Sequence, residues 1–483
     1  MKKILGYTNV WSAMPGDTVN FMVSTYGPER YRADLVRVIC GDDEPDHDIY
    51  REEEIDAPLN GEYTGRFQPI DAGSYAVVPN SPELAGLTSF TVQAWIFPTT
   101  PEKGEQGLIT QWDADTDGGG FALLIDGAGA LTMRVGDGRG GIAEVSTGEP
   151  LAIRRWYLVS GSYNGATKEL NVCQEPIEQP FENLKTASVT NKIKLDAVAN
   201  AEAPLMFAAF PATLSTGTPA SKSHYNGKID RPRISGAVLT SAEISTLAWD
   251  AMPHERNARV VGAWDFSYDI GSDSISDTSP NSLHGWTVNL PSRGCKGFNW
   301  SGTEQNWRHA PQEYGAAHFH DDDLYDANWD TDFDYVIPND LRSGVYAVRL
   351  KVDDDAGEDA GGDEWYMTFF VRPPRGTTTA KLAFLVSTVT YMAYSNYHWM
   401  MHERFCEAGE AFWTTLDKGD VFLQEHNELG LSTYDHHSDG SGVRYASRLR
   451  PVVNMAAKTP LWSFNADSHI LGWLHEKGIE YDV

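Results

Sequence analysis

Short runs in which apolar and polar residues alternate fill most of the chain before residue 372, and such runs predict half-buried β-strands. Val19–Thr25 is one example near the start, and Gly344–Val352 and Trp365–Val371 repeat the pattern much later. The alternative, two separate small β domains, would leave each of them short of core. We therefore expect one discontinuous β-sandwich built from residues 1–68 and 300–372.

The segment between these runs, residues 69–299, carries its own short strand-like runs separated by turns rich in Gly and Asp. They are Phe90–Ile96, Phe121–Ile125, Trp156–Tyr163, Gly227–Ile234 and Val261–Phe266. This texture is typical of an antiparallel sandwich. Tyr75–Pro98, with its Pro-containing turn, and the later runs resemble laminin-G and concanavalin-type jelly rolls. We expect a complete lectin-like domain inserted into the sandwich.

The pattern changes to alternating strands and helices after the linker-like Arg372–Gly376. Leu382–Val389 is an apolar run rich in β-branched residues, which predicts a buried strand. Ser468–Lys477 has a helical pattern, and Ile479–Val483 begins another strand. About 100 residues are too few for a doubly wound sheet with helices on both faces. Residues 376–483 are therefore expected to be the start of an incomplete α/β domain.

The charge balance limits the classes of partner. The chain has 68 acidic against 38 basic residues, a net charge of −30, which argues against nucleic acid or an anionic membrane as a partner. Four widely separated cysteines do not make a disulfide framework. The first residues lack the apolar core of a signal peptide, and no apolar run is long enough to span a membrane. These features favour a cytoplasmic protein.

Two acidic segments have the donors of a metal site. Asp113–Gly118 has alternate aspartates, as a calcium loop requires, but the twelfth position is Leu124 where such a loop needs a glutamate. A hairpin turn with solvated acids is favoured there, so we expect the lectin-like domain to have a structural role. His318–Asp323 places two imidazoles beside three carboxylates, and a surface acidic loop is the favoured interpretation.

Nucleophilic and zinc chemistry are both disfavoured near the C-terminus. His398 and His402 are four residues apart, within or just before a predicted helix over Trp399–Thr414, but the glutamate lies outside the pair, unlike in HExxH sites. Ser441 follows no strand, and Cys406 sits in a helical pattern, so neither has the strained elbow of a nucleophile. The incomplete α/β domain resembles glutamine amidotransferases. Because neither residue suits a nucleophile, this resemblance does not imply covalent acyl chemistry.

Tyrosines are the remaining candidates. Tyr391, Tyr394 and Tyr397 follow the predicted strand, and Tyr434 opens a second polar stretch. A phenolate is a hard, strongly donating anion that suits a trivalent cation such as Fe(III). Spacing alone favours a different interpretation, in which the rings are packing residues with hydroxyls bonded to the backbone.

The segments Thr390–Asn396 and Ser432–Met455 resemble the large subunit of N,N-dimethylformamidases, and the order of domains along the whole chain is similar to that family. The resemblance implies a mononuclear iron held by two tyrosines and one glutamate. The tyrosines carry over to Tyr434 and to one of the three upstream tyrosines, with Tyr394 preferred. The glutamate is expected beyond Val483, which is therefore not expected to be the native end.

The same resemblance implies hydrolysis of N,N-dimethylformamide and related small N-alkyl formamides to formate and an amine, with Fe(III) as Lewis acid. Asn396, His436 and His437 are the candidate assisting groups at the site. A small partner subunit is expected, in a hetero-oligomer with more than one large subunit. The alternative is a carbohydrate-binding or adhesive protein that uses the lectin-like domain.

Overall fold

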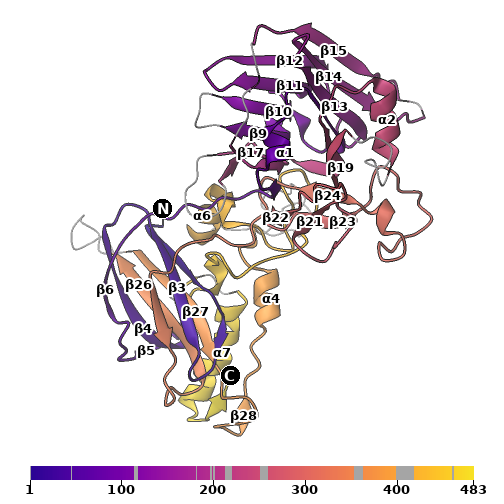
Figure 1. Cartoon of the computed structure of the whole chain (residues 1–483). Helices are drawn as coiled ribbons and strands as arrows, with labels where there is room; N and C mark the ends of the chain where they lie inside the picture. Colours follow the sequence, from indigo (N-terminus) through magenta and orange to yellow (C-terminus); the bar gives the residue numbers. More distant parts are fainter. Residues whose placement is uncertain are drawn as a thin grey trace. The chain divides into compact units, whose positions relative to one another are not determined.

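The chain folds into two compact units in this computed structural model (Figure 1). The sandwich unit comprises residues 1–72 and 324–483, and the inserted unit comprises residues 73–323. The structure describes residues 2–44, 46–113, 118–180, 182–195, 198, 202–212, 220–250, 259–352, 363–398, 418–459 and 462–483.

The sandwich unit takes its strands from both ends of the chain. Its elements are β1 (Ile4–Thr8), β2 (Ser12–Ala13), β3 (Thr18–Thr25), β4 (Arg30–Cys40), β5 (Arg51–Glu54), β6 (Gly61–Thr64), β25 (Phe333–Val336), β26 (Gly344–Val352), β27 (Asp363–Val371), β28 (Leu382–Ala383), α4 (Thr388–Ala393), α6 (Lys418–Glu425), η3 (Asn427–Leu429), η4 (Val453–Met455), α7 (Phe464–Glu476) and β29 (Tyr481–Asp482). One sheet has the order β1-β3-β25 and the other β2-β27-β26-β4-β5, with β6 also paired to β4.

Strand β26 joins the early and late parts of the sequence. Val348 pairs with Leu35 of β4 on one side and with Met367 of β27 on the other. The alternating pattern puts Leu35, Val348 and Met367 on the face that packs against the β1-β3-β25 sheet, where they share a core with Phe21 and Val23. Residues near the N-terminus are thus hydrogen-bonded into one sheet with β26 and β27.

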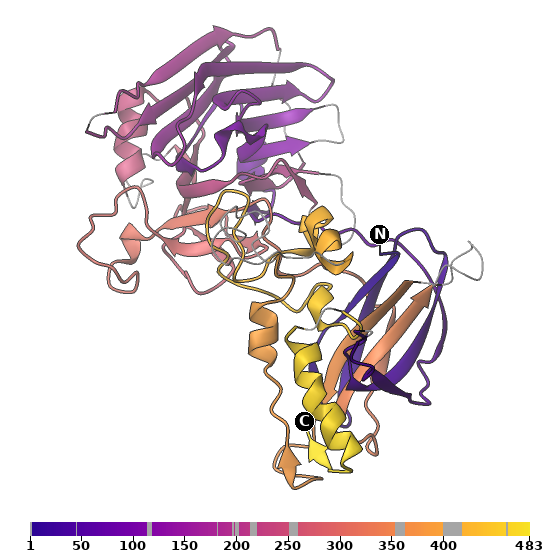
Figure 2. The same cartoon turned by 180° about the vertical axis from the view of Figure 1, so that it is seen from behind.

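The opposite face of the same sheet is covered by the C-terminal segment. Val36 and Val38 of β4 and Phe370 of β27 share a cluster with Leu471 and Leu474 of α7. Figure 2 shows α7 (yellow) lying along this sheet. The helix is amphipathic, since Leu471 and Leu474 are buried while Trp473, between them, is exposed.

The predicted buried strand over Leu382–Val389 is wrong. Only Leu382–Ala383 forms a strand, β28, which pairs in parallel with β29. Leu385 and Val389 are 92% and 78% exposed, and helix α4 starts at Thr388. A parallel strand is buried only when neighbouring strands and helices cover both its faces, and the described residues give β28 just one partner. The amidotransferase-like α/β domain stays a prediction.

The inserted unit is almost entirely β-structure. Its elements are β7 (Tyr75–Val78), α1 (Pro82–Ala85), β8 (Phe90–Pro98), η1 (Pro101–Lys103), β9 (Gln106–Asp113), β10 (Gly119–Ile125), β11 (Ala130–Asp137), β12 (Ile142–Pro150), β13 (Tyr157–Asn164), β14 (Glu169–Pro176), β15 (Ala187–Lys192), β16 (Leu205–Phe207), β17 (Phe210–Pro211), β18 (Ser221–Lys222), β19 (Gly227–Ser235), α2 (Ser241–Trp249), β20 (Val260–Asp265), β21 (Ser274–Asp277), β22 (Gly285–Val288), β23 (Ser292–Cys295), η2 (Pro311–Glu313) and β24 (Ala316–Phe319).

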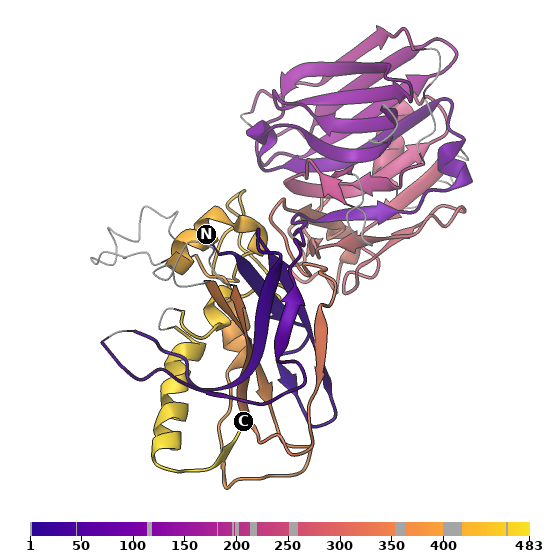
Figure 3. The ribbon, with the colours of Figure 1, turned by 90° about the vertical axis from the view of Figure 1, so that its left-hand side faces the viewer.

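These strands form a curved, layered jelly roll (Figure 3). The hydrogen-bonded order is β12-β11-β10-β9-β16-β7-β22-β21-β20-β19-β8-β13-β14-β15. The sheet folds over a single core, in which Leu123 of β10 and Met133 of β11 meet β13. A methyl group on Gly161 of β13 would meet Met133 Sδ, so a larger residue there would have to displace the Met133 side chain.

The boundary predicted at residue 300 is wrong. Strand β24 pairs with β19 and β23, and its Ala317 and Phe319 lie in the core of the inserted unit. His318 and His320 are buried, so His318–Asp323 is not the expected surface acidic loop. His320 Nδ1 lies 3.0 Å from Asp323 Oδ2, which also accepts a hydrogen bond from Ser74. Burial of the apolar residues of β24 beside β19 stabilises this strand in the inserted unit, although polar residues lie next to it in the sequence.

Some predicted features lie outside the described residues. These are Ala114–Asp117 of the acidic turn, the helix over Trp399–Thr414, and His402 and Cys406 within it. Among the helices that the structure describes, none is both long and apolar enough to cross a membrane.

Candidate functional site

Tyr394 and Tyr434 lie face to face in the sandwich unit. Their ring centroids are 4.0 Å apart and their planes differ by 9°. A hydrogen bond between the two side chains, in which Tyr394 donates to Tyr434, raises the pKa of Tyr394, and desolvation adds to that shift. Tyr434 remains 47% exposed, so the two phenol groups meet at a place that solvent and small molecules can reach.

Local hydrogen bonds between two segments set this pair. Tyr394 caps helix α4, where its backbone N–H donates to Thr390 O. Thr433 donates to Ala393 O through its backbone N–H and through its hydroxyl, each at 2.9 Å. Ser432 Oγ accepts the N–H of Tyr434. The residue before each tyrosine is therefore tied to the other segment, which fixes the rings beside each other.

The other two tyrosines of the upstream segment differ in their surroundings. Tyr397 lies edge-on, with ring centroids 5.8 Å from Tyr394 and 6.3 Å from Tyr434. Tyr391 is buried and its hydroxyl donates to Asp467 on α7. Burial first, and Asp467 next, raise the pKa of Tyr391 far above its usual range, so this phenol stays protonated.

Asn396 is a structural residue in this arrangement. It is fully buried at φ 57°, a left-handed conformation in which Asn is tolerated better than most residues. Its side-chain amide donates to Leu429 O and Pro451 O, and its Oδ1 accepts the N–H of Val453. The amide nitrogen and oxygen of Asn396 are engaged with the backbone, and an assisting role of this residue at the site stays a prediction.

His436 and His437 lie on the turn that follows Tyr434. His436 is exposed and pairs through its backbone with Gly442. His437 is buried, its N–H donates to Ser441 O, and its carbonyl accepts the N–H of Gly440. Both histidines are therefore held within a few residues of Tyr434, one facing solvent and the other not.

Two buried charged residues that the sequence did not single out hold the site together. Arg450 is 1% exposed and donates to the carbonyl oxygens of Leu429, Leu431 and Ser447 and to Ser395 Oγ. Burial lowers its pKa to about 10, so it remains charged at neutral pH. An arginine beside a leucine in a polar stretch carries no sequence signal for such a role.

Asp435 is the second of these residues. Its carboxylate accepts hydrogen bonds from the backbone N–H of Ser432 and of His398, and one oxygen lies 3.2 Å from His398 Nδ1. Burial opposes the ionised form, but His398 and Ser432 outweigh it and hold the pKa of Asp435 below its usual range. The anion thus joins the segment of Tyr394 to the segment of Tyr434.

A separate group in the sandwich unit has the donors of a metal site. Asp42 Oδ2 lies 2.6 Å from His47 Nδ1 and 2.8 Å from His469 Nε2 of α7. Asp42 is buried, whereas the two imidazoles are partly exposed. The three groups satisfy one another as hydrogen bonds, and they are also a candidate His/Asp ligand set of a kind that suits several transition metals.

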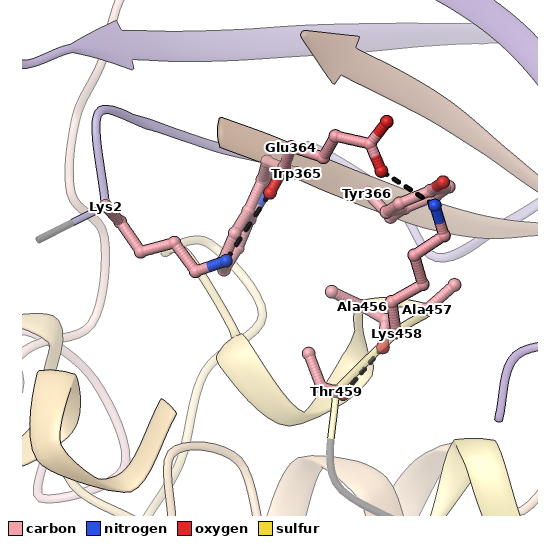
Figure 4. A pocket seen from close by; sticks show the side chains of 8 residues that line it. All are labelled: Lys2, Glu364, Trp365, Tyr366, Ala456, Ala457, Lys458 and Thr459. Atoms are coloured by element: carbon pink, nitrogen blue, oxygen red, sulfur yellow. Dashed lines mark hydrogen bonds and ion pairs between the residues drawn. The ribbon is translucent and has the colours of Figure 1, made fainter. Parts of the chain in front are cut away.

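A small pocket of about 160 Å³ opens beside β27 (Figure 4). Lys458 Nζ lies 2.8 Å from Glu364 Oε2, and Lys351 pairs with the other oxygen of the same carboxylate. Lys2 reaches the carbonyl oxygen of Glu364. These polar groups at the pocket are already paired with one another, so it offers little to a ligand compared with the tyrosine cluster.

Comparison with known families defines the class of protein. Residues 71–174 match the concanavalin A-like lectin/glucanases superfamily. Residues 292–483, which contain the tyrosine cluster, match the family described as N,N-dimethylformamidase beta subunit-like, C-terminal. The protein is therefore mostly β, with a lectin-type jelly roll and a region similar to the C-terminal part of N,N-dimethylformamidase beta subunits.

The whole chain aligns with two relatives. It is 36% identical to the N,N-dimethylformamidase beta subunit of Paracoccus aminophilus and 35% identical to that of an Alcaligenes species. The alignments cover 100% and 99% of this chain and 64% of each relative. The chain is a homologue of N,N-dimethylformamidase beta subunits that spans about 64% of their length.

Among solved structures, the CBM40 of the Ruminococcus gnavus IT-sialidase, bound to alpha2,3 sialyllactose, is similar at 17% identity and a TM-score of 0.27. That alignment covers 38% of this chain and 96% of the module.

Proposed function

We propose that this chain forms part of the large subunit of an amidase that hydrolyses N,N-dimethylformamide and related small N-alkyl formamides. The observation that carries the proposal is the stacked pair Tyr394 and Tyr434, which lies in the region that matches the dimethylformamidase family. In the reaction, water adds to the carbonyl carbon, the C–N bond breaks, and the nitrogen takes up a proton. The products are formate and an amine.

The residues present fit an Fe(III) ion. The two phenol oxygens interact with each other and are hard donors, and a cation that replaced both phenol protons would be held by two anionic ligands. Tyr434 is half exposed, so an ion and a small substrate have access. When bound, Fe(III) would act as a Lewis acid and polarise the amide carbonyl. A tertiary amide has no N–H group that a protein could recognise instead. A third protein ligand is expected from outside this pair.

The chain's own residues would have three tasks in this proposal. Asp435 and Arg450 hold the two tyrosine segments in register, which keeps the donor oxygens together without further reorganisation. His436, two residues beyond Tyr434 and exposed, would carry the proton to the departing amine, because an imidazole can both accept and donate a proton. His437, buried in the same turn, would help to orient that segment.

The relatives' designation as beta subunits supports a partner subunit for this chain as well. We propose a small partner and a hetero-oligomer with more than one large subunit, in the cytoplasm. The match of residues 71–174 to a lectin-type superfamily favours a second candidate, a carbohydrate-binding or adhesive protein. Glycan binding without any amidase activity would support that alternative.

One experiment tests the proposal. The full-length subunit, co-expressed with its partner, would be assayed for bound iron and for formate release from N,N-dimethylformamide. We expect about one iron per large subunit, visible absorption from phenolate-to-iron charge transfer, and formate production that depends on iron. Iron-loaded protein that releases no formate, or formate release that survives complete iron removal, would contradict the proposal.

A further inference from the structure

The loop that follows β4 carries a buried carboxylate that two imidazoles share. Asp42 is 1% exposed, and its Oδ2 lies 2.6 Å from His47 Nδ1 and 2.8 Å from His469 Nε2. A hydrogen-bonded link between this loop and α7 would need only one imidazole on the oxygen. The second imidazole brings three atoms that are good transition-metal ligands to one place.

The geometry of these three atoms is close to that of a metal site. The carboxylate oxygen and the two ring nitrogens all lie within 4.8 Å of one another. The two rings have their centroids 6.1 Å apart and their planes differ by 87°, so they approach the oxygen from different directions. Zinc bonds of about 2.0–2.1 Å at tetrahedral angles place ligand atoms roughly 3.4 Å apart. Each contact to Asp42 would therefore have to open by less than about 1 Å to admit the ion.

The local structure of the loop brings His47 back to Asp42. The backbone N–H of Glu44 donates to Asp42 Oδ1 at 3.0 Å, and the backbone N–H of His47 donates to Glu44 O at 2.9 Å. Asp48, directly after His47, has φ 47°, a left-handed conformation that Asp adopts more readily than most residues. The bond from Glu44 occupies one carboxylate oxygen and so holds the other toward the imidazoles.

Helix α7 holds His469 beside this loop. The backbone N–H of Gly41 donates to Ser468 Oγ at 2.9 Å, and these two residues immediately precede the carboxylate and the helical imidazole. A methyl group on Gly472 would lie 3.3 Å from Cys40 Cβ, so the helix and the end of β4 are in close contact. The ligands thus come from two backbones that are already positioned, which lowers the cost of ordering a site.

The surroundings give a cation access and attract it. The side chains of His47 and His469 are 41% and 37% exposed. A pocket of about 230 Å³ opens beside His469, between α7 and the end of β4. An ion with three protein ligands keeps a further position for water, and this pocket leads to it. The loop also carries four exposed acids that raise the local concentration of cations, namely Asp43, Glu44, Asp46 and Asp48.

We infer that Asp42, His47 and His469 bind a Zn²⁺ ion that fastens α7 to the loop after β4. Two imidazole nitrogens and one carboxylate oxygen suit Zn²⁺, whereas Ca²⁺ and Mg²⁺ prefer oxygen ligands alone. On binding, His47 Nδ1 and His469 Nε2 give up their hydrogen bonds to Asp42, and each ring carries its proton on its other nitrogen. The site shares no residue with the tyrosine pair, so it stands independently of the iron proposal.

The test uses the whole chain, treated with a chelator and then titrated with Zn²⁺, or with Co²⁺ as a coloured substitute. We expect one ion per chain to bind at this site with a Kd in the micromolar range or below. At a hundredfold excess over Kd, Zn²⁺ should raise the Tm of the sandwich unit by about 5–10 °C. Hydrogen exchange in α7 should slow, and the Co²⁺ form should absorb visible light.

Two conservative variants separate a metal ligand from a hydrogen-bonding partner. His47→Gln and His469→Gln both keep a side chain that can donate to Asp42, and both positions are partly exposed, so neither variant should unfold. Each should lower zinc affinity by about 100-fold or more and abolish the Zn²⁺-dependent rise in Tm. His475→Gln, in the last turn of α7, is the matched control and should bind Zn²⁺ like the wild type. Tyr434→Phe should also keep this ion.

Three outcomes would overturn the proposal. In the first, the wild type binds no Zn²⁺ with micromolar affinity, or binds only an ion that Tyr434→Phe removes. In the second, His47→Gln and His469→Gln both retain wild-type affinity, which would show that the three side chains form only a hydrogen-bonded link. In the third, His469→Gln and His475→Gln lose affinity equally, so that binding follows the stability of α7 and not these ligands.

Discussion

Two regions of this chain, the tyrosine pair in the sandwich unit and the surroundings of Asp230 in the inserted unit, differ in how their buried polar groups are hydrogen-bonded. In the sandwich unit, Asn396, Arg450 and Asp435 are each buried and each bonded to several backbone groups. In the inserted unit, Asp230 is equally buried and bonded to none. A complete polar network rigidifies the segments it joins.

This difference separates the surroundings of the tyrosine pair from those of Asp230. Around Tyr394 and Tyr434, the supporting residues Asn396, Asp435 and Arg450 are all hydrogen-bonded, and Tyr434 is half exposed. Around Asp230, both carboxylate oxygens are buried and lack a hydrogen-bond partner among the described residues. The first region is open to an incoming small molecule, whereas the second is enclosed.

The largest expected effect comes from the tyrosine pair. In the assembled enzyme, Tyr434→Phe and Tyr394→Phe should each lower bound iron severely and reduce kcat by roughly 10³-fold or more, because losing the metal forfeits several kcal/mol of charge stabilisation. The ring is kept, so hydrogen-exchange protection should stay close to wild type in both units. Metal analysis and formate release measure the outcome.

Tyr391→Phe is the matched control for the pair. Its hydroxyl is bonded to Asp467 and faces away from the cluster, so the variant should lose some stability but keep its iron. Tyr397→Phe should also keep the metal. Full iron occupancy in Tyr434→Phe would refute the ligand assignment. Loss of iron in Tyr397→Phe with retention in Tyr394→Phe would move the first ligand along the chain.

The two units also differ in how well their sequences predict them. The apolar runs in Phe90–Ile96 and Phe121–Ile125 predict strands that the structure has as parts of β8 and β10. Leu382–Val389 looked like a buried strand for the same reason, yet it is exposed. An apolar run shows that a segment has residues suited to burial. Whether the segment is buried depends on the strands and helices that pack against it.

The candidate site was predictable only in part. The resemblance to the family pointed to Tyr394 and Tyr434, which the structure places in contact. Spacing alone could not separate Tyr391 from these two tyrosines as a candidate ligand. The direction of α4 and the hydrogen bond of Tyr391 to Asp467 depend on the tertiary structure. The roles of Arg450 and Asn396 could not be read either, since the carbonyl oxygens they satisfy come from distant turns.

Removal of the buried arginine is the next largest test of the comparison. Arg450→Met should destabilise the sandwich unit by about 3–5 kcal/mol, because carbonyl oxygens of Leu429 and Leu431 lose buried donors. Hydrogen exchange should show the loss in the sandwich unit and leave residues 73–323 largely unchanged. The exposed Arg375→Met is the control and should have little effect. Equal loss in both units would show that they unfold together.

A core substitution in the inserted unit gives the converse. Leu123 is fully buried between β10 and β13, so Leu123→Ala should cost about 3 kcal/mol through lost burial and a cavity. The loss of protection should appear within residues 73–323, while iron content of the assembled enzyme stays at the wild-type level. A fall in iron content comparable to that of Tyr434→Phe would show that the inserted unit supports the metal site directly.

The smallest expected effect concerns acid sensitivity of the inserted unit at the turn between β10 and β11. Asp126 accepts hydrogen bonds from the backbone of Ala128 and Ala130 and from the hydroxyls of Thr132 and Ser146. Burial opposes its ionisation, but Ser146 and these other donors outweigh burial and lower the pKa of Asp126. A carboxyl whose pKa is lower in the folded state stabilises that state fully above its unfolded pKa. The contribution is lost as pH falls through the folded pKa.

Asp126→Asn should therefore flatten the loss of stability of the inserted unit on acidification below pH about 4, where an unfolded Asp titrates. At neutral pH the same variant should cost about 1–2 kcal/mol, since an amide nitrogen replaces one acceptor among several donors. Denaturant unfolding between neutral and acidic pH measures both. Asp269→Asn, an exposed aspartate of the same unit, is the control and should leave the acid limb as steep as in the wild type. If Asp126→Asn does so too, the acid sensitivity belongs to other carboxylates, and the turn is held by its backbone alone.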